Sequence, residues 1–256
     1  MRRRVAYTSA AVALAITAAT VGYVLARDCS PEAQILAAIE SNLNAIGSLT
    51  ADVSCTCSDN SLSFQDGQLL LKGADKTRIW RAADDNQVWC NGDYFDVYTP
   101  GLQFGFLWND SGGNQTTWWC AKAGYTDPRS ALGAAQSATD LELATGTEVV
   151  NGVTCYKLFG TGIRLWVDAN NNARVIRWEL DYDAGQGGGL AGRADYTGWT
   201  TVSGCEVPTE LDLEMFDGSG NSLIRFEYSA SNIQVDGTLD DSLFYFWTPP
   251  DSSTLN

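Results

Sequence analysis

The chain of 256 residues contains no histidine. Histidine completes the common serine and cysteine hydrolase sites, so those sites and histidine-based zinc centres are excluded. Carboxylates could still act in pairs as acid and base. The candidates are Asp181 with Asp183, the set Glu210, Asp212 and Glu214, and Asp240 with Asp241. The first two sets alternate with apolar residues, so we expect a solvent-facing sheet surface there and predict no enzyme activity, no cofactor and no metal.

Basic residues are scarce, since 16 Lys and Arg stand against 31 Asp and Glu and the net charge is −15. A surface this acidic repels phosphate backbones, so nucleic acid is excluded as a partner. Direct electrostatic docking on an anionic bilayer is disfavoured for the same reason. The charge is explained by solubility and by repulsion between copies, and we expect a monomer.

The N-terminus carries an uncharged run rich in Ala, Val and Ile, Val5–Ala26, after arginines at positions 2, 3 and 4. This order is typical of an export signal cleaved before Arg27. The run is also long enough to remain as a membrane anchor. A third interpretation is lipidation of Cys29, although Asp28 stands where such a signal needs a small residue. We expect residues 1–26 to direct the chain to the periplasm or cell envelope, and residues 30–256 to form one exported domain.

Seven cysteines follow the export signal. In an oxidising compartment such a number predicts disulfides, and Cys29 is the odd one by position. The remaining candidates, whose connectivity stays open, are Cys55, Cys57, Cys90, Cys120, Cys155 and Cys205. A metal site built on Cys55 and Cys57 is the less favoured alternative, because no histidine accompanies them.

Two segments have the features of helices. Residues 31–49 begin after Ser30, a good N-cap, with Pro31 at the first helical position, and Gly47 marks the end. Apolar residues follow the helical repeat at Ile35, Leu36, Ile39, Leu43 and Ile46. A second, shorter helix is predicted over residues 128–136, with Asp127 as its cap.

Alternation of apolar and polar residues dominates the rest of the chain. It predicts strands over residues 50–57, 62–72, 76–82, 87–91, 94–98, 149–151, 154–159, 163–168, 174–182, 195–202, 210–216 and 223–229. Short Asn- and Asp-rich turns join the first five strands into an antiparallel meander. Residues 100–120 break the alternation, residues 185–192 are expected to form a flexible loop, and residues 217–221 a hairpin turn rather than a calcium loop.

These elements predict a mainly β fold: a curved antiparallel sheet forming an incomplete β-barrel, with an N-terminal helix and a short second helix as lid. Two modest helices cannot cover the apolar face of about a dozen strands, so we expect a concave apolar cavity. The alternative is an interior filled by the protein's own side chains. Candidate wall residues are Leu69, Leu71, Trp80, Phe95, Val97, Ile176, Trp178, Leu211, Leu213, Ile224 and Phe226. Phe104, Phe106 and Trp108 would form a mouth or lid loop.

The helix and the strands after it resemble the start of the outer-membrane lipoprotein carrier family (LolA/LolB-like). The matching positions are Gly67, Leu69, Leu71, Lys72, Trp80, Gly92, Tyr98 and Pro100, followed by Asp127-Pro128, Leu165–Asp168, Val207-Pro208 and Asp240–Phe246. The resemblance implies an incomplete barrel with a helical lid that binds acyl chains of lipoproteins or other lipids in the periplasm. The family's Arg-Pro after the lysine is replaced here by Gly73-Ala74, which departs from the dedicated sorting protein.

Three functions follow from these observations. The first is an exported, non-enzymatic carrier that binds lipid or lipoprotein acyl chains in an apolar cavity. The second is an envelope sensor or protein-interaction module on the same scaffold, with a membrane-protein partner, which a retained N-terminal anchor would favour. The third, less favoured, is a hydrolase that acts through carboxylates.

Overall fold

The computed structural model describes residues 30–58, 63–73, 76–81, 86–91, 94–99, 104–109, 128–181 and 189–244. Of residues 81, 86–91, 94–99, 104–109 and 130 only the backbone is described. The predicted export signal and Cys29 lie outside these ranges. Within the described ranges, no helix combines the length and the apolar character needed to cross a membrane.

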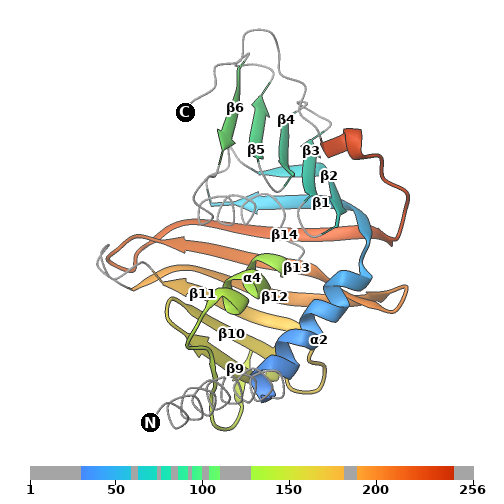
Figure 1. The fold of residues 1–256 in the computed structure, drawn as a ribbon. Coiled ribbons are helices and arrows are strands. Elements are labelled where there is room, and N and C mark those ends of the chain that lie inside the picture. Colours follow the sequence, from blue (N-terminus) through green and yellow to red (C-terminus); the bar gives the residue numbers. More distant parts are fainter. Residues whose placement is uncertain are drawn as a thin grey trace, which may run out of the picture.

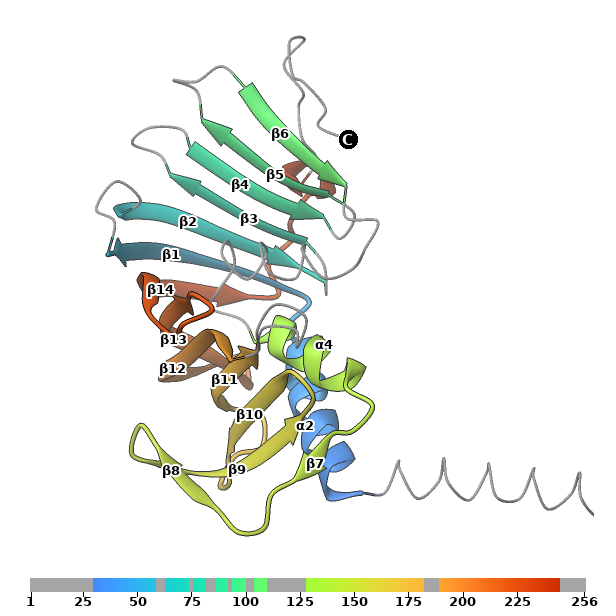
Figure 2. The same ribbon diagram turned by 90° about the vertical axis from the view of Figure 1, so that its left-hand side faces the viewer.

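The described strands form one antiparallel sheet of fourteen strands (Figures 1 and 2). Their bounds are β1 Ser48–Cys57, β2 Phe64–Lys72, β3 Lys76–Arg81, β4 Asn86–Asn91, β5 Tyr94–Thr99, β6 Phe104–Asn109, β7 Glu142–Leu143, β8 Glu148–Val150, β9 Val153–Gly160, β10 Ile163–Asp168, β11 Val175–Asp181, β12 Leu190–Val202, β13 Cys205–Phe216 and β14 Ser222–Val235. The spatial order is β6-β5-β4-β3-β2-β1-β14-β13-β12-β11-β10-β9-β7, with β8 paired to β9. The predicted curved, mainly β fold is confirmed, and the sheet is not closed.

The chain enters the sheet in its middle. Strand β1 pairs with β2 on one side and with the last strand, β14, on the other. From β1 a meander runs outward through the five predicted strands and continues to β6, which was not predicted. A second meander from β9 to β14 returns to β1. Residues 190–192 were expected to belong to a loop, but they pair with β11 and β13 as the start of β12.

The helix α2 (Pro31–Ala45) starts as predicted, because the Ala33 amide donates to the Ser30 hydroxyl at 3.3 Å. It ends four residues before the predicted end at Leu49. The C-cap residue is Ile46, whose amide donates to the Leu43 carbonyl, and β1 begins at Ser48. Leu49 pairs with both β2 and β14, so strand pairing prevails over the helical repeat at that point.

The second helix, α4 (Arg129–Ser137), follows Pro128, and the structure gives that end no side-chain cap bond. Its predicted cap, Asp127, lies outside the described residues. Helices α2 and α4 pack on one another and on the same face of β9–β14, which we call the inner face (Figure 2). The 3₁₀ turn η4 (Asp241–Phe244) packs at β3 and β4.

The buried residues fall into three clusters. The inner-face cluster joins α2 and α4 to β1 and β9–β14 and includes Leu165, Trp178 and Leu213. The β1–β2 cluster lies beside it on the same side of β1 and includes Leu49, Leu69 and Leu71. The outer-face cluster, on the opposite side of β9–β11, consists of Val150, Cys155, Trp166 and Ile176.

Candidate functional site

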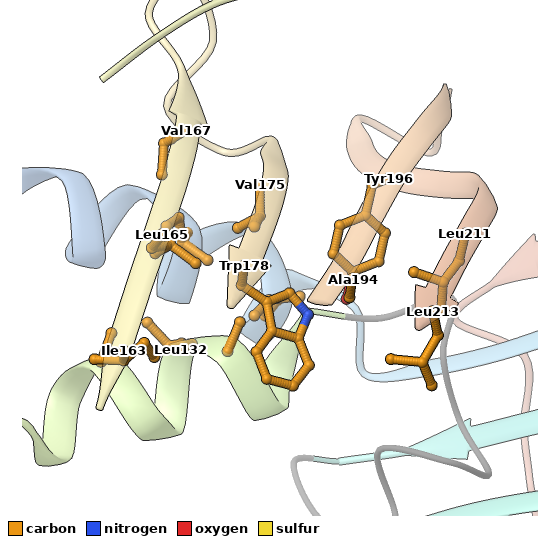
Figure 3. Packing of buried hydrophobic residues seen from close by; sticks show 14 of the residues in the cluster. Leu132, Ile163, Leu165, Val167, Val175, Trp178, Ala194, Tyr196, Leu211 and Leu213 are labelled. Carbon is orange, nitrogen blue, oxygen red and sulfur yellow. The ribbon is translucent and has the colours of Figure 1, made fainter. Parts of the chain in front are cut away.

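An uninterrupted apolar row crosses the inner face of the sheet. Each residue of the row pairs with the next one on the neighbouring strand, and eight strands contribute one residue each. In order, the row consists of Cys57, Phe226, Leu213, Ala194, Trp178, Leu165, Leu158 and Leu143. Directly paired residues of antiparallel strands occupy the same face. Figure 3 shows Trp178, Leu213, Leu165 and Ala194 on that face beside α4. This row is our candidate site.

Five predicted wall residues belong to this half of the inner face. Trp178, Leu211, Leu213 and Phe226 are buried members of the inner-face cluster, and Ile224 packs against it. The prediction is wrong for Ile176, which lies in the outer-face cluster. The cause is a β-bulge, since Val167 pairs with Val175 whereas Trp166 pairs with Arg177, and the extra residue turns Ile176 to the other face.

The remaining wall residues lie on β2, β3 and β5. Leu69 and Leu71 are buried in the β1–β2 cluster together with Ile79. The predicted Trp80 is on the opposite face, because the register places Ile79 opposite Leu69 and Trp80 opposite Gln68. A shift of one residue in register reverses every side chain, and the alternation of β3 alone does not fix which set faces inward.

The backbone register extends both rows to the edge of the sheet. Leu69 continues through Ile79, Val88 and Val97 to Phe106, and Leu71 continues through Thr77, Cys90 and Phe95 to Trp108. Phe104 pairs with Thr99. These aromatics were expected in a mouth or lid loop, but they belong to the edge strand β6, because they alternate with period two and β5 offers them a pairing edge.

Phe64 connects the two inner clusters, since it packs against both. Its ring lies directly over Gly67, so that a Cβ atom at Gly67 would come within 2.5 Å of the ring. Gly67 therefore allows the ring to lie flat on β2. The predicted wall residues did not include Phe64. They also omitted Ile163, Leu165 and Val167, although the period-two pattern of residues 163–168 places these three on one face.

Helix α4 packs on β10 and contributes mainly small side chains to the inner-face cluster. Ala131, Leu132 and Ala135 are its buried residues in the inner-face cluster. The Arg129 guanidinium donates to the carbonyls of Leu43 and Ile46, at 3.3 and 3.2 Å, where α2 ends. Gln136 donates to Glu40 at 3.2 Å on the exposed side. An isolated helix of this length is marginal in water, so α4 depends on these contacts.

Charged side chains of β10–β14 form ion pairs on the outer face of the sheet. One register row runs Arg225, Glu214, Arg193, Glu179 and Arg164 across five strands, with alternating charge. Arg193 contacts Glu214 at 2.6 Å, and Arg164 contacts Asp181 at 2.6 Å. Asp212 forms an ion pair with Arg225. The candidate acids Asp181, Asp212 and Glu214 are therefore occupied by arginines, as in a structural ion-pair network.

The other acid candidates also have structural roles. Glu210 accepts a hydrogen bond from Thr197 on the exposed side. Lys72 and Lys76 contact Asp241 and lower its pKa, and the Ser242 amide lowers the pKa of Asp240. Asp217 accepts the amides of Ser219 and Asn221 in the predicted hairpin turn. Asp183 lies outside the described residues, and the described part contains no group of acids and thiols suited to a metal.

The disulfide prediction is wrong for the described thiols Cys57, Cys155 and Cys205. They lie in three different clusters, and Cys155 is on the opposite face from Cys57, so neither sulfur can reach the other. Burial raises the pKa of Cys155 to about 11 and also raises that of Cys205. Cys55 is buried beside Cys57. Cys90 is described by its backbone alone, and Cys120 lies outside the described residues.

Comparison with known proteins finds no matching family model and no matching curated protein. Solved structures match across most of the chain. A DUF1329 family protein from Desulfovibrio piger has a TM-score of 0.58 at 15% identity, covering 84% of this chain and 95% of its own. A LolA superfamily protein from Nitrosomonas europaea has 0.55 at 16%, covering 85% and 99%. A domain described as an outer membrane lipoprotein-sorting protein, from Vibrio parahaemolyticus, has 0.59 at 12%, covering 82% and 94%. The chain therefore has a LolA-like fold.

Proposed function

We propose that this protein is an exported, non-enzymatic carrier that binds acyl chains of a lipid or lipoprotein against the inner face of its sheet. The observation that carries the proposal is the apolar row from Cys57 to Leu143, which crosses eight strands without a charged residue. The LolA-like fold supports it, since one similar structure is described as a lipoprotein-sorting domain.

In the described structure the protein's own helices fill the β9–β13 part of the row, and Leu158 and Leu165 are fully buried there. We propose that α4 acts as a lid and moves when an acyl chain enters. Its buried side chains, two alanines and one leucine, are smaller than the two isoleucines and one leucine that α2 contributes. Burying ten methylenes would contribute about 8 kcal/mol before the cost of ordering the chain. Against that gain stands the loss of the contacts of a nine-residue helix whose buried side chains are two alanines and one leucine.

Ligand displacement tests the proposal. The apolar dye N-phenyl-1-naphthylamine should bind the full-length chain and be displaced by methyl palmitate. Ala194 is the small residue between Trp178 and Leu213 in the row. The larger side chain of Ala194→Leu should fill the space beside the indole and weaken binding of both compounds at least tenfold. Leu223→Ala is the control, since Leu223 is 61% exposed. Failure of the wild-type protein to bind either compound would refute the carrier function.

We further propose that residues 1–26 are an export signal and that the domain acts as a monomer in the cell envelope. Mass spectrometry of the protein from its own envelope gives the mature N-terminus directly. Cleavage before Arg27 fits a shuttle, which must leave its membrane. A retained N-terminal segment would favour the second function, an envelope sensor or interaction module with a membrane-protein partner.

A further inference from the structure

Trp178 carries an unusual polar group for its position. The side chain is 5% exposed and belongs to the apolar row on the inner face. Its indole nitrogen is buried and has no hydrogen-bond partner among the described residues. Figure 3 shows the ring projecting away from β11, with the nitrogen on the side of Ala194 and Leu213. Neither of those side chains can accept a hydrogen bond.

A buried N–H group without a partner destabilises a folded protein, and buried indoles usually find an acceptor. Phenylalanine at this position would fill an apolar wall without that cost. The residues that flank Trp178 in its row, Leu165 and Ala194, are both apolar. A molecule that lies along the row could supply the acceptor that these side chains do not provide.

The surroundings also restrict the charge of that acceptor. All members of the inner-face cluster are uncharged, whereas Arg164, Arg177 and Arg193 of the neighbouring strands form their ion pairs on the outer face. An ionised carboxylate or phosphate buried beside Trp178 would lack a cation, and burying an unpaired charge is strongly unfavourable. A neutral carbonyl accepts one hydrogen bond without that penalty.

We propose that the Trp178 indole N–H donates to the neutral carbonyl of an acyl ester or amide, so that the protein selects esterified or amidated chains over hydrocarbons and ionised fatty acids. The inference rests on the proposed function, because it assigns a polar contact to the same face. The carbonyl would sit beside Ala194, the smallest residue of the row, and the hydrocarbon chain would extend along the remaining apolar residues.

Dye displacement with three probes of similar chain length tests the inference: methyl palmitate, hexadecane and, at pH 8, palmitate. The wild-type protein should bind methyl palmitate about tenfold more tightly than Trp178→Phe does, the ratio expected for one buried hydrogen bond. Hexadecane should bind both proteins equally. Trp199→Phe is the matched control, since Trp199 also has a buried indole nitrogen with no partner among the described residues but is not in the row.

Equal binding of methyl palmitate by wild type and Trp178→Phe would overturn the inference, while binding of hexadecane would still support the carrier. Binding of no probe by wild type would instead refute the carrier. NMR of the wild-type protein with ¹⁵N-labelled tryptophan needs no stable variant: methyl palmitate should move one indole N–H signal downfield, and hexadecane should not. An indole spectrum that responds identically to both probes would contradict the proposed hydrogen bond.

Discussion

Removal of the contact between α4 and the end of α2 tests most sharply whether α4 acts as a lid. Arg129, the first residue of α4, donates to two carbonyls at the C-terminus of α2, and α2 has no basic residue of its own in its last turn. The Leu43 carbonyl also accepts the Ile46 amide. Carbonyls at the C-terminus of a helix carry partial negative charge, so a cation there is favourable. We therefore expect Arg129→Met, which keeps the length of the aliphatic chain, to release α4.

The magnitude follows from this contact. The same guanidinium nitrogen donates to both carbonyls, so we count the contact as one hydrogen bond to a charged group, which contributes about 1.5–3 kcal/mol. Distances of 3.2 and 3.3 Å with a half-buried side chain place it near the lower end, at about 2 kcal/mol. Such a loss corresponds to about a 30-fold rise in the population with α4 detached. The sheet core does not contain Arg129, so the rest of the fold should be little affected.

Hydrogen exchange of the amides of residues 132–137, which form the hydrogen bonds of α4, measures that population. In Arg129→Met these amides should exchange about 30-fold faster, with those of α2 and β10 unchanged. Gln136→Met, which removes only the exposed bond to Glu40, is the control and should change exchange by no more than about threefold. Unchanged exchange in Arg129→Met, or equal acceleration in α4, α2 and β10, would refute the idea that α4 opens as a separate unit.

Three further predictions concern other parts of the molecule. Gly67→Ala should lower the free energy of unfolding by about 1–3 kcal/mol in urea denaturation, because its Cβ would collide with the Phe64 ring; an unchanged midpoint would disprove the close approach. Cys155, whose pKa burial raises to about 11, should resist iodoacetamide at pH 8 in the native protein and react once unfolded, as peptide mass spectrometry would show. Lys72 and Lys76 hold the pKa of Asp241 below its ordinary value of 3.8. Their contacts with the ionised carboxylate therefore stabilise the folded state above about pH 4, and this stabilisation is lost as the pH falls through the folded-state pKa of Asp241. Lys72→Met should raise that pKa in a carboxyl NMR titration, and an unaltered curve would show that the contact is absent.

Much of the sheet could be predicted from alternation alone. The strand over residues 163–168 matches β10 at both ends, and β3, β4 and β5 agree with their predicted ranges to within one residue. Local sequence was informative here because each strand has one apolar side and is bounded by turn residues. The N-terminus of α2 was equally predictable, since Ser30 and Pro31 act within one helical turn.

The errors arise where pairing between distant segments decides the result. The bulge at Ile176 depends on how β10 meets β11, and the face of Trp80 depends on its register with β2. The end of α2 depends on β14, which pairs with Leu49 from the other end of the chain. For the same reason the sequence placed Phe104–Trp108 in a loop, although β5 makes that segment a strand.

The site could be predicted only as a set of apolar residues. Trp178, Leu211, Leu213 and Phe226 were assigned correctly to one face, but which face the helices cover is decided by the whole fold. The unpaired nitrogen of Trp178 could not be inferred from sequence, because it depends on the absence of acceptors in the described strands around it.

The acyl-chain site is tested most directly by NMR of the protein labelled with ¹³C at its leucine methyl groups. The measurement is of intermolecular NOEs between these methyl groups and bound methyl palmitate. The account predicts NOEs from the palmitate methylenes to Leu213 and Leu165 on the inner face and none to the exposed Leu223. A bound chain that contacts Leu223 but neither inner-face leucine, or an absence of NOEs at saturating ligand, would contradict it.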